Sequence, residues 1–330
     1  MQVIEKIADL ETLPGPLHLA IGVFDGVHLG HRAVIEAAEE SARLAGGTAV
    51  VVTFDPHPVE VLKPELAPRL LTDTPHKLLV LGREFRVGAV LLVRFDADFA
   101  SLSGESFVGQ LLAAAGEGGI ARICVGRSWR FGKGRSGDLA LLERLGEAHG
   151  FSVSGIDTVE LGGDRVSSTR VRESVAAGDL DTAALLLGRR YSVHGPVVRG
   201  RQLGRTIGFP TANLSVNREQ LPPPGVYAVV AGGSAGRWEG VANLGHRPTV
   251  EGGGAELKLE VHLFGVDREL YGEDLEVEFV AWIRPEQRFD GLDALKEQIR
   301  RDADEALAIH RKAELSAKCH HSGIDAAHNF

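Results

Sequence analysis

The order of strand-like and helix-like segments constrains the fold of this chain most. In its first half, short runs rich in Val, Ile and Leu alternate with segments of helical periodicity. The runs span residues 17–23, 48–53, 89–95 and 123–126, and the helical segments span 32–44, 104–115 and 137–149. This alternation predicts parallel strands joined by crossover helices, a doubly wound Rossmann-like α/β sheet. Such sheets bind ligands beyond the carboxyl ends of their strands, so a site is expected there.

The pattern changes near residues 180–188, after which strand-like runs follow one another without helices between them. These runs span residues 191–198, 225–231, 239–243, 257–263 and 275–282. Gly and Pro separate them, so the pattern predicts a small antiparallel β-barrel. A C-terminal helix is expected over 292–313, where Leu292, Leu295 and Ile299 recur at helical spacing. We therefore expect a first domain over 1–186, a second over 187–313 and a tail over 314–330.

Composition narrows the class of partner. The chain has 36 Lys and Arg against 45 Asp and Glu, a formal net charge of −9. This balance argues against nucleic acid and favours small ligands held by locally placed basic residues. Residues 1–10 mix charged and apolar side chains, so neither a signal peptide nor a membrane span is expected. Cys124 and Cys319 form no disulfide framework, which favours a cytoplasmic protein, and we expect a monomer or weak oligomer.

The last residues, 316–330, contain Cys319-His320-His321 but no apolar period. A metal site is one interpretation of this cluster. The composition favours a disordered tail instead.

Residues 22–31, Gly-Val-Phe-Asp-Gly-Val-His-Leu-Gly-His, follow directly on the first apolar run. The Asp25-Gly26 turn signal predicts strand, tight turn and a helix that starts near His28. His28 and His31 would then share one helix face, at a terminus whose backbone N–H groups favour anions. We interpret the segment as a nucleotide phosphate site, and a metal pair or two solvated histidines as the alternative.

Two further segments of the first domain agree with a phosphate site. Thr53-Phe-Asp-Pro-His-Pro58 follows the second strand, and its prolines predict a rigid loop around His57. In Val166-Ser-Ser-Thr-Arg-Val-Arg172, Ser168 and Thr169 can cap a helix whose N–H groups hold phosphate, and Arg172 follows one turn later. A plain loop and a simple helix cap are the respective alternatives.

The second domain contains a glycine-rich loop with Gly200, Gly204 and Gly208, interleaved with Arg199, Arg201 and Arg205. Such a loop can wrap phosphates with its backbone, although a tight barrel turn explains it equally well. Pro210 stiffens its exit. Thr211 and Asn213 point the same way if the segment is extended, and their oxygens suit Mg²⁺.

The order of these motifs resembles the bifunctional riboflavin kinase/FAD synthetases of bacteria. In the first domain, residues 22–31, 53–58, 130–137 and 167–172 carry the resemblance. In the second, Gly204-Arg-Thr-Ile-Gly-Phe-Pro-Thr-Ala-Asn-Leu214 carries it, together with 225–227, 241–249 and 260–263. The likeness covers residues 15–310.

The resemblance implies two reactions: phosphorylation of riboflavin to FMN by ATP, and adenylylation of FMN to FAD with release of pyrophosphate. It implies that Glu260 is the general base of the kinase and that His28 and His31 stabilise phosphate charge in the adenylyltransferase. No permanently bound cofactor is expected, only Mg²⁺ with ATP. The ATP contacts implied for the adenylyltransferase are Gly22, Phe24, Asp25, Gly26, His28, Gly30, His31, Ser168, Thr169 and Arg172. Those implied for Mg-ATP in the kinase are Gly204, Arg205, Gly208, Pro210, Thr211 and Asn213, with Thr211 and Asn213 on the metal.

One loop departs from the family pattern. The family has an Asp or Asn followed by Phe where this chain has Ser128 and Trp129, in a loop that the resemblance assigns to flavin contacts together with His57. Serine is shorter and tryptophan offers a larger stacking face, so flavin binding could be altered. Two alternatives therefore stay open: an enzyme with kinase activity only, and a flavin-binding or regulatory protein without chemistry.

Overall fold

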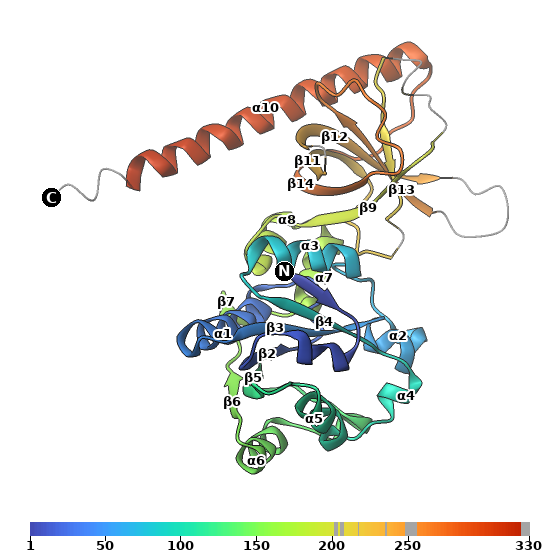
Figure 1. Cartoon of the computed structure of the whole chain (residues 1–330). Helices are drawn as coiled ribbons and strands as arrows, with labels where there is room; N and C mark the ends of the chain where they lie inside the picture. Colours follow the sequence, from blue (N-terminus) through green and yellow to red (C-terminus); the bar gives the residue numbers. More distant parts are fainter. Residues whose placement is uncertain (201–203, 205–207, 217, 235, 248–255, 325–330) are drawn as a thin grey trace. The chain divides into compact units, whose positions relative to one another are not determined.

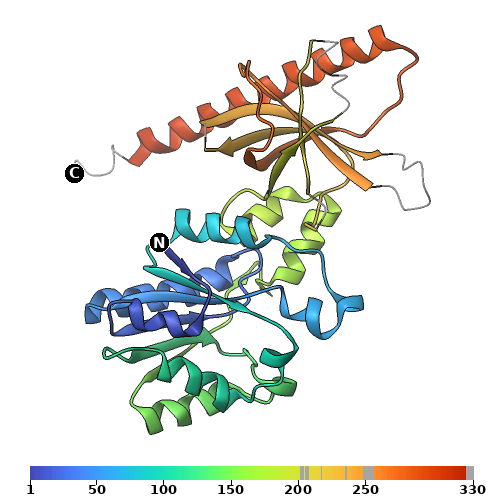
Figure 2. The same cartoon turned by 45° about the vertical axis from the view of Figure 1, so that its right-hand side comes forward.

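The structure is a computed structural model that describes residues 1–200, 204, 208–216, 218–234, 236–247 and 256–324. Residue contacts divide the chain into two compact units. One comprises Met1–Val171 with Leu186–Gly188, and the other Arg172–Leu185 with Arg189–Phe330. The segment 172–185 thus belongs by its contacts to the second unit, while the domain boundary expected at residue 186 stays a prediction. We describe each unit by itself (Figures 1 and 2).

The first unit is built on a six-stranded sheet in the order β1-β4-β3-β2-β5-β6, and every neighbouring pair is parallel. The strands are β1 (Gln2–Ile4), β2 (Leu17–Ile21), β3 (Thr48–Asp55), β4 (Ala89–Arg94), β5 (Ile120–Gly126) and β6 (Ser152–Ile156). The predicted doubly wound sheet is confirmed. Its two edge strands, β1 and β6, were not foreseen, because both are short and carry few buried side chains.

Helices cover both faces of this sheet (Figure 1). They are α1 (Leu29–Ala45), α2 (Pro58–Leu62), α3 (Thr74–Glu84), α4 (Ala97–Ala100), α5 (Gly104–Ala113) and α6 (Leu139–His149), with 3-10 turns at Ile7–Thr12, Pro64–Leu66 and Lys133–Arg135. Further along the chain come the hairpin β7 (Glu160–Leu161) and β8 (Asp164–Arg165), then α7 (Ser168–Ala177) and α8 (Leu180–Leu187).

Alternation along the strands divides the core of this unit in two. Successive side chains of a strand point to opposite faces of a sheet. Val52 of β3 accordingly packs in one cluster with Leu111 of α5, while its neighbour Val51 packs in another with Ile35 of α1 and Leu81 of α3. Both faces are apolar, as a parallel sheet between two helical layers requires.

The second unit contains a closed barrel in the order β10-β13-β12-β11-β14-β9, and its neighbouring pairs are antiparallel. The strands are β9 (Ser192–Val198), β10 (Ala212–Leu214), β11 (Gly225–Gly233), β12 (Gly236–Arg247), β13 (Glu256–Leu263) and β14 (Asp274–Arg284). The helix α10 (Leu292–Ile324) buries Ala303 and Ala306 against Val226 and Val241 of the barrel. The predicted antiparallel barrel and C-terminal helix are confirmed.

The helix α10 continues beyond residue 313, where the sequence analysis placed its end. No glycine or proline stands between Gly291 and Gly323 to end it, and residues 314–318 are ordinary helix formers. The interpretation of residues 314–324 as disordered is therefore corrected to helix. Residues 325–330, and the side chains of Cys319, His320 and His321, lie outside the described part of the structure.

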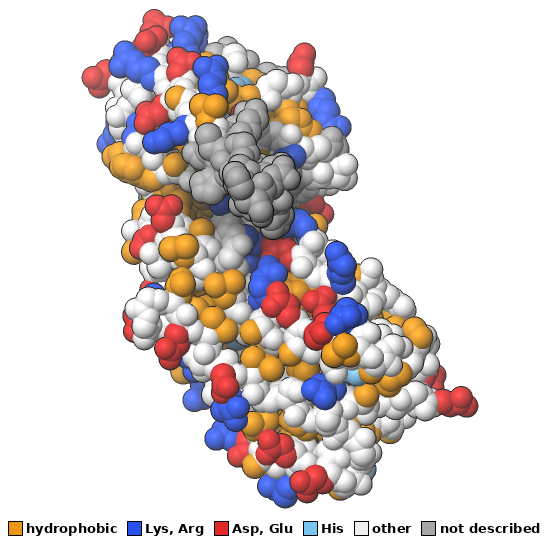
Figure 3. Space-filling view, turned by 90° about the vertical axis from the view of Figure 1, so that its left-hand side faces the viewer, with side chains coloured by type: hydrophobic (Ala, Val, Ile, Leu, Met, Phe, Trp, Pro, Cys, Tyr) orange, Lys and Arg blue, Asp and Glu red, His pale blue; other side chains and the backbone are white. Residues whose placement is uncertain are grey.

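Two observations bear on partners. Acidic and basic side chains are interspersed on the face of the molecule shown in Figure 3. In the described part of the chain, no helix combines the length and apolar character needed to cross a bilayer.

Candidate functional site

A cavity of about 800 Å³ opens at the carboxyl edge of the sheet in the first unit. Its walls include Gly22 just after β2, Phe54 near the end of β3, Phe95 after β4 and residues 126–132 from β5 onward. This is the position at which open parallel sheets bind ligands. The motif at 22–31 therefore lies where its chemistry was expected.

The turn between β2 and α1 forms one wall of the cavity. It holds Phe24 and Val27 at positive φ, 53° and 42°, together with Gly26 at 81°. Such angles are uncommon for residues with a side chain and persist only where the surroundings fix them. A Cβ at Gly22 would lie 2.9 Å from the Phe24 ring, so glycine is required there for the ring to fold back. The predicted order of strand, tight turn and helix is confirmed.

The two histidines meet at the start of α1. His28 is the N-cap, and its Nδ1 accepts a hydrogen bond from the backbone N–H of His31 at 3.3 Å. The two rings stack with centroids 3.6 Å apart, and the Phe24 ring meets His31 edge-on. Both histidines line the cavity, beside a helix N-terminus that favours negative charge.

Asp25 and Gly26 hold the turn from behind and are not among the residues that line the cavity. Asp25 Oδ1 accepts hydrogen bonds from the backbone N–H groups of Leu71 and Thr72, at 2.9 and 3.0 Å. The N–H of Gly26 donates to Thr72 Oγ1 at 3.0 Å. Their place in the structure is that of anchors for the turn.

The start of α7 reaches the same turn. Ser168 Oγ donates a hydrogen bond to the carbonyl of Asp25 at 3.0 Å, and both Ser168 and Thr169 line the cavity. Gly30 lies between the two segments: a Cβ there would lie 3.2 Å from the His28 ring and 3.6 Å from the carbonyl of Val166. Arg172 belongs by its contacts to the second unit, so its proposed phosphate contact stays a prediction.

An aromatic wall, of which the sequence analysis predicted only Trp129, lines the other side of this cavity. It consists of Phe54, Phe95, Phe99, Phe107, Trp129 and Phe131. Trp129 stacks on Phe131 with centroids 4.6 Å apart, and the rings of Phe54, Phe95 and Phe99 meet at 5.6–5.9 Å. These residues come from separate strands, helices and loops, so no spacing pattern in the sequence indicates that they form one wall. The wall offers apolar ring faces and edges to a planar ring system.

Basic side chains surround the aromatic wall, and the sequence analysis missed them as well. Arg127, Arg130 and Arg165 all line the cavity. Arg165 donates to the hydroxyl of Ser128 at 3.4 Å, so Ser128 is held at the cavity rim. His57 also lines the cavity and caps α2 by accepting the N–H of Val59 at 3.2 Å. The three residues expected at a flavin site, His57, Ser128 and Trp129, thus lie on one cavity.

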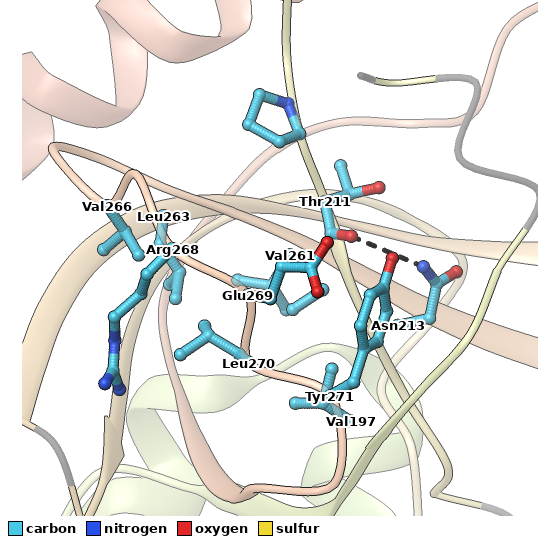
Figure 4. A pocket seen from close by; sticks show the side chains of 12 residues that line it. Val197, Thr211, Asn213, Val261, Leu263, Val266, Arg268, Glu269, Leu270 and Tyr271 are labelled. Atoms are coloured by element: carbon cyan, nitrogen blue, oxygen red, sulfur yellow. Dashed lines mark hydrogen bonds between the residues drawn. The ribbon is translucent and has the colours of Figure 1, made fainter. Parts of the chain in front are cut away.

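A second, smaller pocket of about 80 Å³ lies in the barrel unit (Figure 4). Pro210, Thr211 and Asn213 line it at the start of β10, opposite Glu269 and Tyr271 from the segment between β13 and β14. Asn213 is 4 % exposed, and its Nδ2 donates to the carbonyl of Thr211 at 3.5 Å. Its Oδ1 is buried and has no hydrogen-bond partner among the described residues.

The glycines of the loop before β10 are fixed by close contacts. A Cβ at Gly200 would lie 2.4 Å from Asn213 Nδ2, and one at Gly204 would lie 2.2 Å from the carbonyl of Phe209. The N–H of Phe209 donates back to the carbonyl of Gly204 at 2.8 Å. The loop therefore needs glycine where its backbone meets Thr211 and Asn213. Gly208 is described at φ 87°, whereas Arg201 and Arg205 lie outside the described residues.

Glu260 is held by strand register. On β13 it pairs with Asn213 of β10 on one side and with Asn243 of β12 on the other. Directly opposed residues share a face, so the three side chains form a polar row on the face away from the buried Leu259. Lys258 Nζ contacts Glu260 Oε1 at 2.6 Å. Glu260 does not line the smaller pocket, and Asn243 and Lys258 were not foreseen.

Among the described residues, no group of three or more His, Cys, Asp or Glu side chains is arranged to hold a metal ion. Any divalent cation in these sites therefore needs other oxygen ligands, such as the phosphates of a nucleotide.

Comparisons with known proteins match the two halves of the chain to two enzyme families. The profile of the FAD synthetase family matches residues 11–170, and that of the riboflavin kinase family matches residues 187–310. A bifunctional riboflavin kinase/FMN adenylyltransferase of Escherichia coli strain K12 is 43% identical over 304 residues, which cover 92% of this chain and 96% of the relative. The enzyme of the same name from Bacillus subtilis is 36% identical over 88% of this chain and 91% of its own.

A solved structure from Streptococcus pneumoniae, whose title names a macrolide-efflux protein, shares the fold with a TM-score of 0.74 and 29% identity. The alignment covers 92% of this chain and 97% of that one. On the two family matches and the full-length relatives, this chain belongs to the bifunctional riboflavin kinase/FMN adenylyltransferases.

Proposed function

We propose that the chain phosphorylates riboflavin to FMN in the barrel unit and joins FMN to AMP in the sheet unit. ATP is the second substrate of both reactions, and pyrophosphate leaves in the second. The observation that carries this proposal is that each family match contains its own pocket. The two chemically different phosphate transfers can therefore take place at two separate sites.

In the adenylyl transfer, an oxygen of the FMN phosphate attacks the α-phosphorus of ATP, and the bond to the pyrophosphate oxygen breaks. No protein nucleophile is needed, because the FMN phosphate is already an anion. His28, His31 and the N-terminus of α1 serve as donors to the charge that builds up on the triphosphate. Thr169 adds a hydroxyl donor from the start of α7. Ser168, whose hydroxyl donates to the carbonyl of Asp25, and Asp25 itself keep the turn in place.

The flavin ring is assigned to the aromatic wall. Phe54, Phe99 and Trp129 offer ring faces and edges for an isoalloxazine. Arg127 and Arg165 line the same cavity, and Arg165 donates to Ser128. His57 comes from the rim of the same cavity. A cavity of about 800 Å³ is in the range expected for small-molecule sites.

In the kinase reaction, the 5′-hydroxyl of riboflavin attacks the γ-phosphorus of ATP and ADP leaves. Glu260 accepts the hydroxyl proton, and Lys258 keeps its carboxylate oriented. The loop with Gly204 and Gly208 is assigned to the phosphates, together with Arg205 and Pro210. Positioning and charge neutralisation do most of the work in such transfers.

The residues present fit Mg²⁺ in the kinase. The buried Oδ1 of Asn213 has no partner among the described residues, and the Thr211 hydroxyl lies on the same pocket. Both are hard oxygen ligands of the kind that Mg²⁺ takes alongside phosphates. When bound there, the ion would offset phosphate charge, and the protein would contribute Thr211 and Asn213 to hold it.

The remaining expectations are part of the same proposal. We propose that the protein is cytoplasmic, because its proposed substrates ATP and riboflavin are available in the cytoplasm. The dispersed charge on the face in Figure 3 supports small-molecule partners over nucleic acid. We propose a monomer or weak oligomer, since each described pocket is lined by residues of one unit.

One time course tests the proposal. The purified full chain is incubated with riboflavin, Mg²⁺ and ATP, and riboflavin, FMN and FAD are separated over time. FMN should rise first and FAD should follow. FMN without FAD, also when FMN is supplied, would instead favour the kinase-only alternative that Ser128 and Trp129 keep open. Binding of flavin with no product would favour the regulatory alternative.

A further inference from the structure

A buried lysine under the adenylyltransferase cavity has no part in the mechanism above. Lys77 lies on α3, is 5 % exposed and does not line the cavity. A lysine is almost never buried unless its ammonium group is paired, so Lys77 is expected to have polar partners. The partners of Lys77 join two loops that carry proposed substrate contacts.

The first partner belongs to the turn that carries the histidines. Lys77 Nζ donates to the carbonyl of Val23 at 3.0 Å, one residue before the strained Phe24. It also donates to Thr53 Oγ1 at 3.3 Å, and Thr53 Oγ1 itself donates to Val23 O at 2.9 Å. Lysine and threonine thus hold the same carbonyl, where β2 ends and the turn begins.

The second connection reaches the loop that carries His57. Thr53 lies near the end of β3, directly before the segment 54–58. The hydroxyl of Thr74, at the start of α3, donates to Asp55 Oδ1 at 2.5 Å. The helix α3 therefore touches the β2–α1 turn through Lys77 and the β3–α2 loop through Thr74.

Charge favours an ammonium group at this point. Three carboxylates, those of Asp25, Asp55 and Asp73, interact with Lys77. Burial lowers the pKa of Lys77 from its ordinary value, and these carboxylates act in the opposite direction. An uncharged side chain of the same length would lose both donated hydrogen bonds and leave the carboxylates without this cation.

We propose that Lys77 is a positioning residue of the adenylyl transfer. By holding Val23 and Thr53, it keeps the turn at residues 22–31 and the loop that carries His57 in the correct positions relative to each other. The inference rests on the proposed function and adds a residue to it. Small displacements of donors cost much rate when they alter the geometry of the reacting groups. The lysine thus acts on catalysis through the backbone of the turn, without touching substrate.

The test compares Lys77→Met and Lys77→Arg with Val80→Ala in the full chain. Val80 lies on the same helix and is fully buried in the core cluster that also contains Phe24 and Val27, so its truncation weakens the packing of α3 but removes no hydrogen bond to Val23 or Thr53. We expect Lys77→Met to lower kcat for FAD synthesis on the order of 10- to 100-fold, with a smaller change in KM. Lys77→Arg should recover part of the rate, and riboflavin phosphorylation should be unchanged in all three.

Backbone amide exchange supplies a readout besides activity. Exchange in the segment 22–31 should speed up more in Lys77→Met than in Val80→Ala, because only the former loses the hydrogen bonds to Val23 and Thr53. Equal losses of FAD synthesis in Lys77→Met and Val80→Ala, or unchanged exchange over 22–31 in Lys77→Met, would overturn the proposal. If the parent chain makes no FAD, the proposed function fails while the exchange result still decides the role of Lys77.

Thr53→Val keeps the inference testable if Lys77→Met does not fold. This nearly isosteric change removes one of the two groups that hold Val23 O and leaves the lysine in place. It should lower kcat for FAD synthesis in the same direction by a smaller factor. If kcat of this variant equals that of the parent chain, the proposal that Lys77 and Thr53 hold the turn at residues 22–31 in place is contradicted.

Discussion

The structure separates two roles of His28 that can be tested apart. As the N-cap of α1, His28 accepts the N–H of His31, and as a cavity residue it presents an imidazole to the proposed triphosphate. His28→Ala removes both, and His28→Asn keeps a good helix cap but removes the imidazole. His31→Ala removes the other imidazole, with its stacking on His28, and leaves the capping side chain in place.

The magnitudes of these two roles differ. Loss of one preorganised donor to transition-state charge costs on the order of 10²–10³ in kcat. Loss of an N-cap costs about 1 kcal/mol of stability, which for a unit of this size lowers Tm by roughly 2–4 °C. We therefore expect all three variants to lose at least about 10²-fold in FAD synthesis, and only His28→Ala to show the capping loss in Tm.

The assay is the initial rate of FAD formation from supplied FMN and ATP, with Tm measured on the same preparations. Riboflavin phosphorylation by the barrel unit serves as an internal control and should persist in every variant. The reasoning would be refuted by a His28→Asn variant that makes FAD at the parent rate, because capping alone would then explain the histidine. Loss of both activities at a strongly lowered Tm would mark the histidines as structural.

Three further predictions concern the barrel unit and the tail. Glu260→Gln should lower riboflavin phosphorylation by about 10²–10⁴ while FMN is still converted to FAD; parallel loss of both in a folded variant contradicts the division of labour. Gly200→Ala should lower kcat of the kinase, because its Cβ would lie 2.4 Å from Asn213. Gly232→Ala, which meets nothing within 4 Å, is the matched control. Removal of residues 316–330 should leave both rates and the melting temperature unchanged, since this segment has no apolar period to bury; a lower Tm would show that the end of α10 packs.

Local motifs could be predicted from the sequence where one short segment contains the whole feature. The turn at 22–31 includes its strand end, its turn residues and its helix cap, so its shape followed from neighbouring residues alone. The alternation of apolar runs likewise revealed the parallel sheet, because buried strands and amphipathic helices have different periods.

Features assembled from distant segments could not be predicted in this way. Phe54, Phe99 and Trp129 meet on one cavity only because the sheet brings the ends of its strands together. Lys77 has an ordinary place in a helical pattern, and only the tertiary structure places its ammonium group under Val23. The anchoring of Asp25 could not be predicted for the same reason, since its partners Leu71 and Thr72 lie far along the chain.

The polar row of Asn213, Glu260 and Asn243 has a consequence for how the barrel tolerates insertions and deletions. β13 is paired on both sides, with β10 and with β12, so its register is fixed twice. A slip by one residue would turn Glu260 inward and Leu259 outward, which this double pairing opposes. A change in the length of the segment that joins β12 to β13 would therefore leave the Glu260 carboxylate in place, so this length can change over evolution without moving the proposed base.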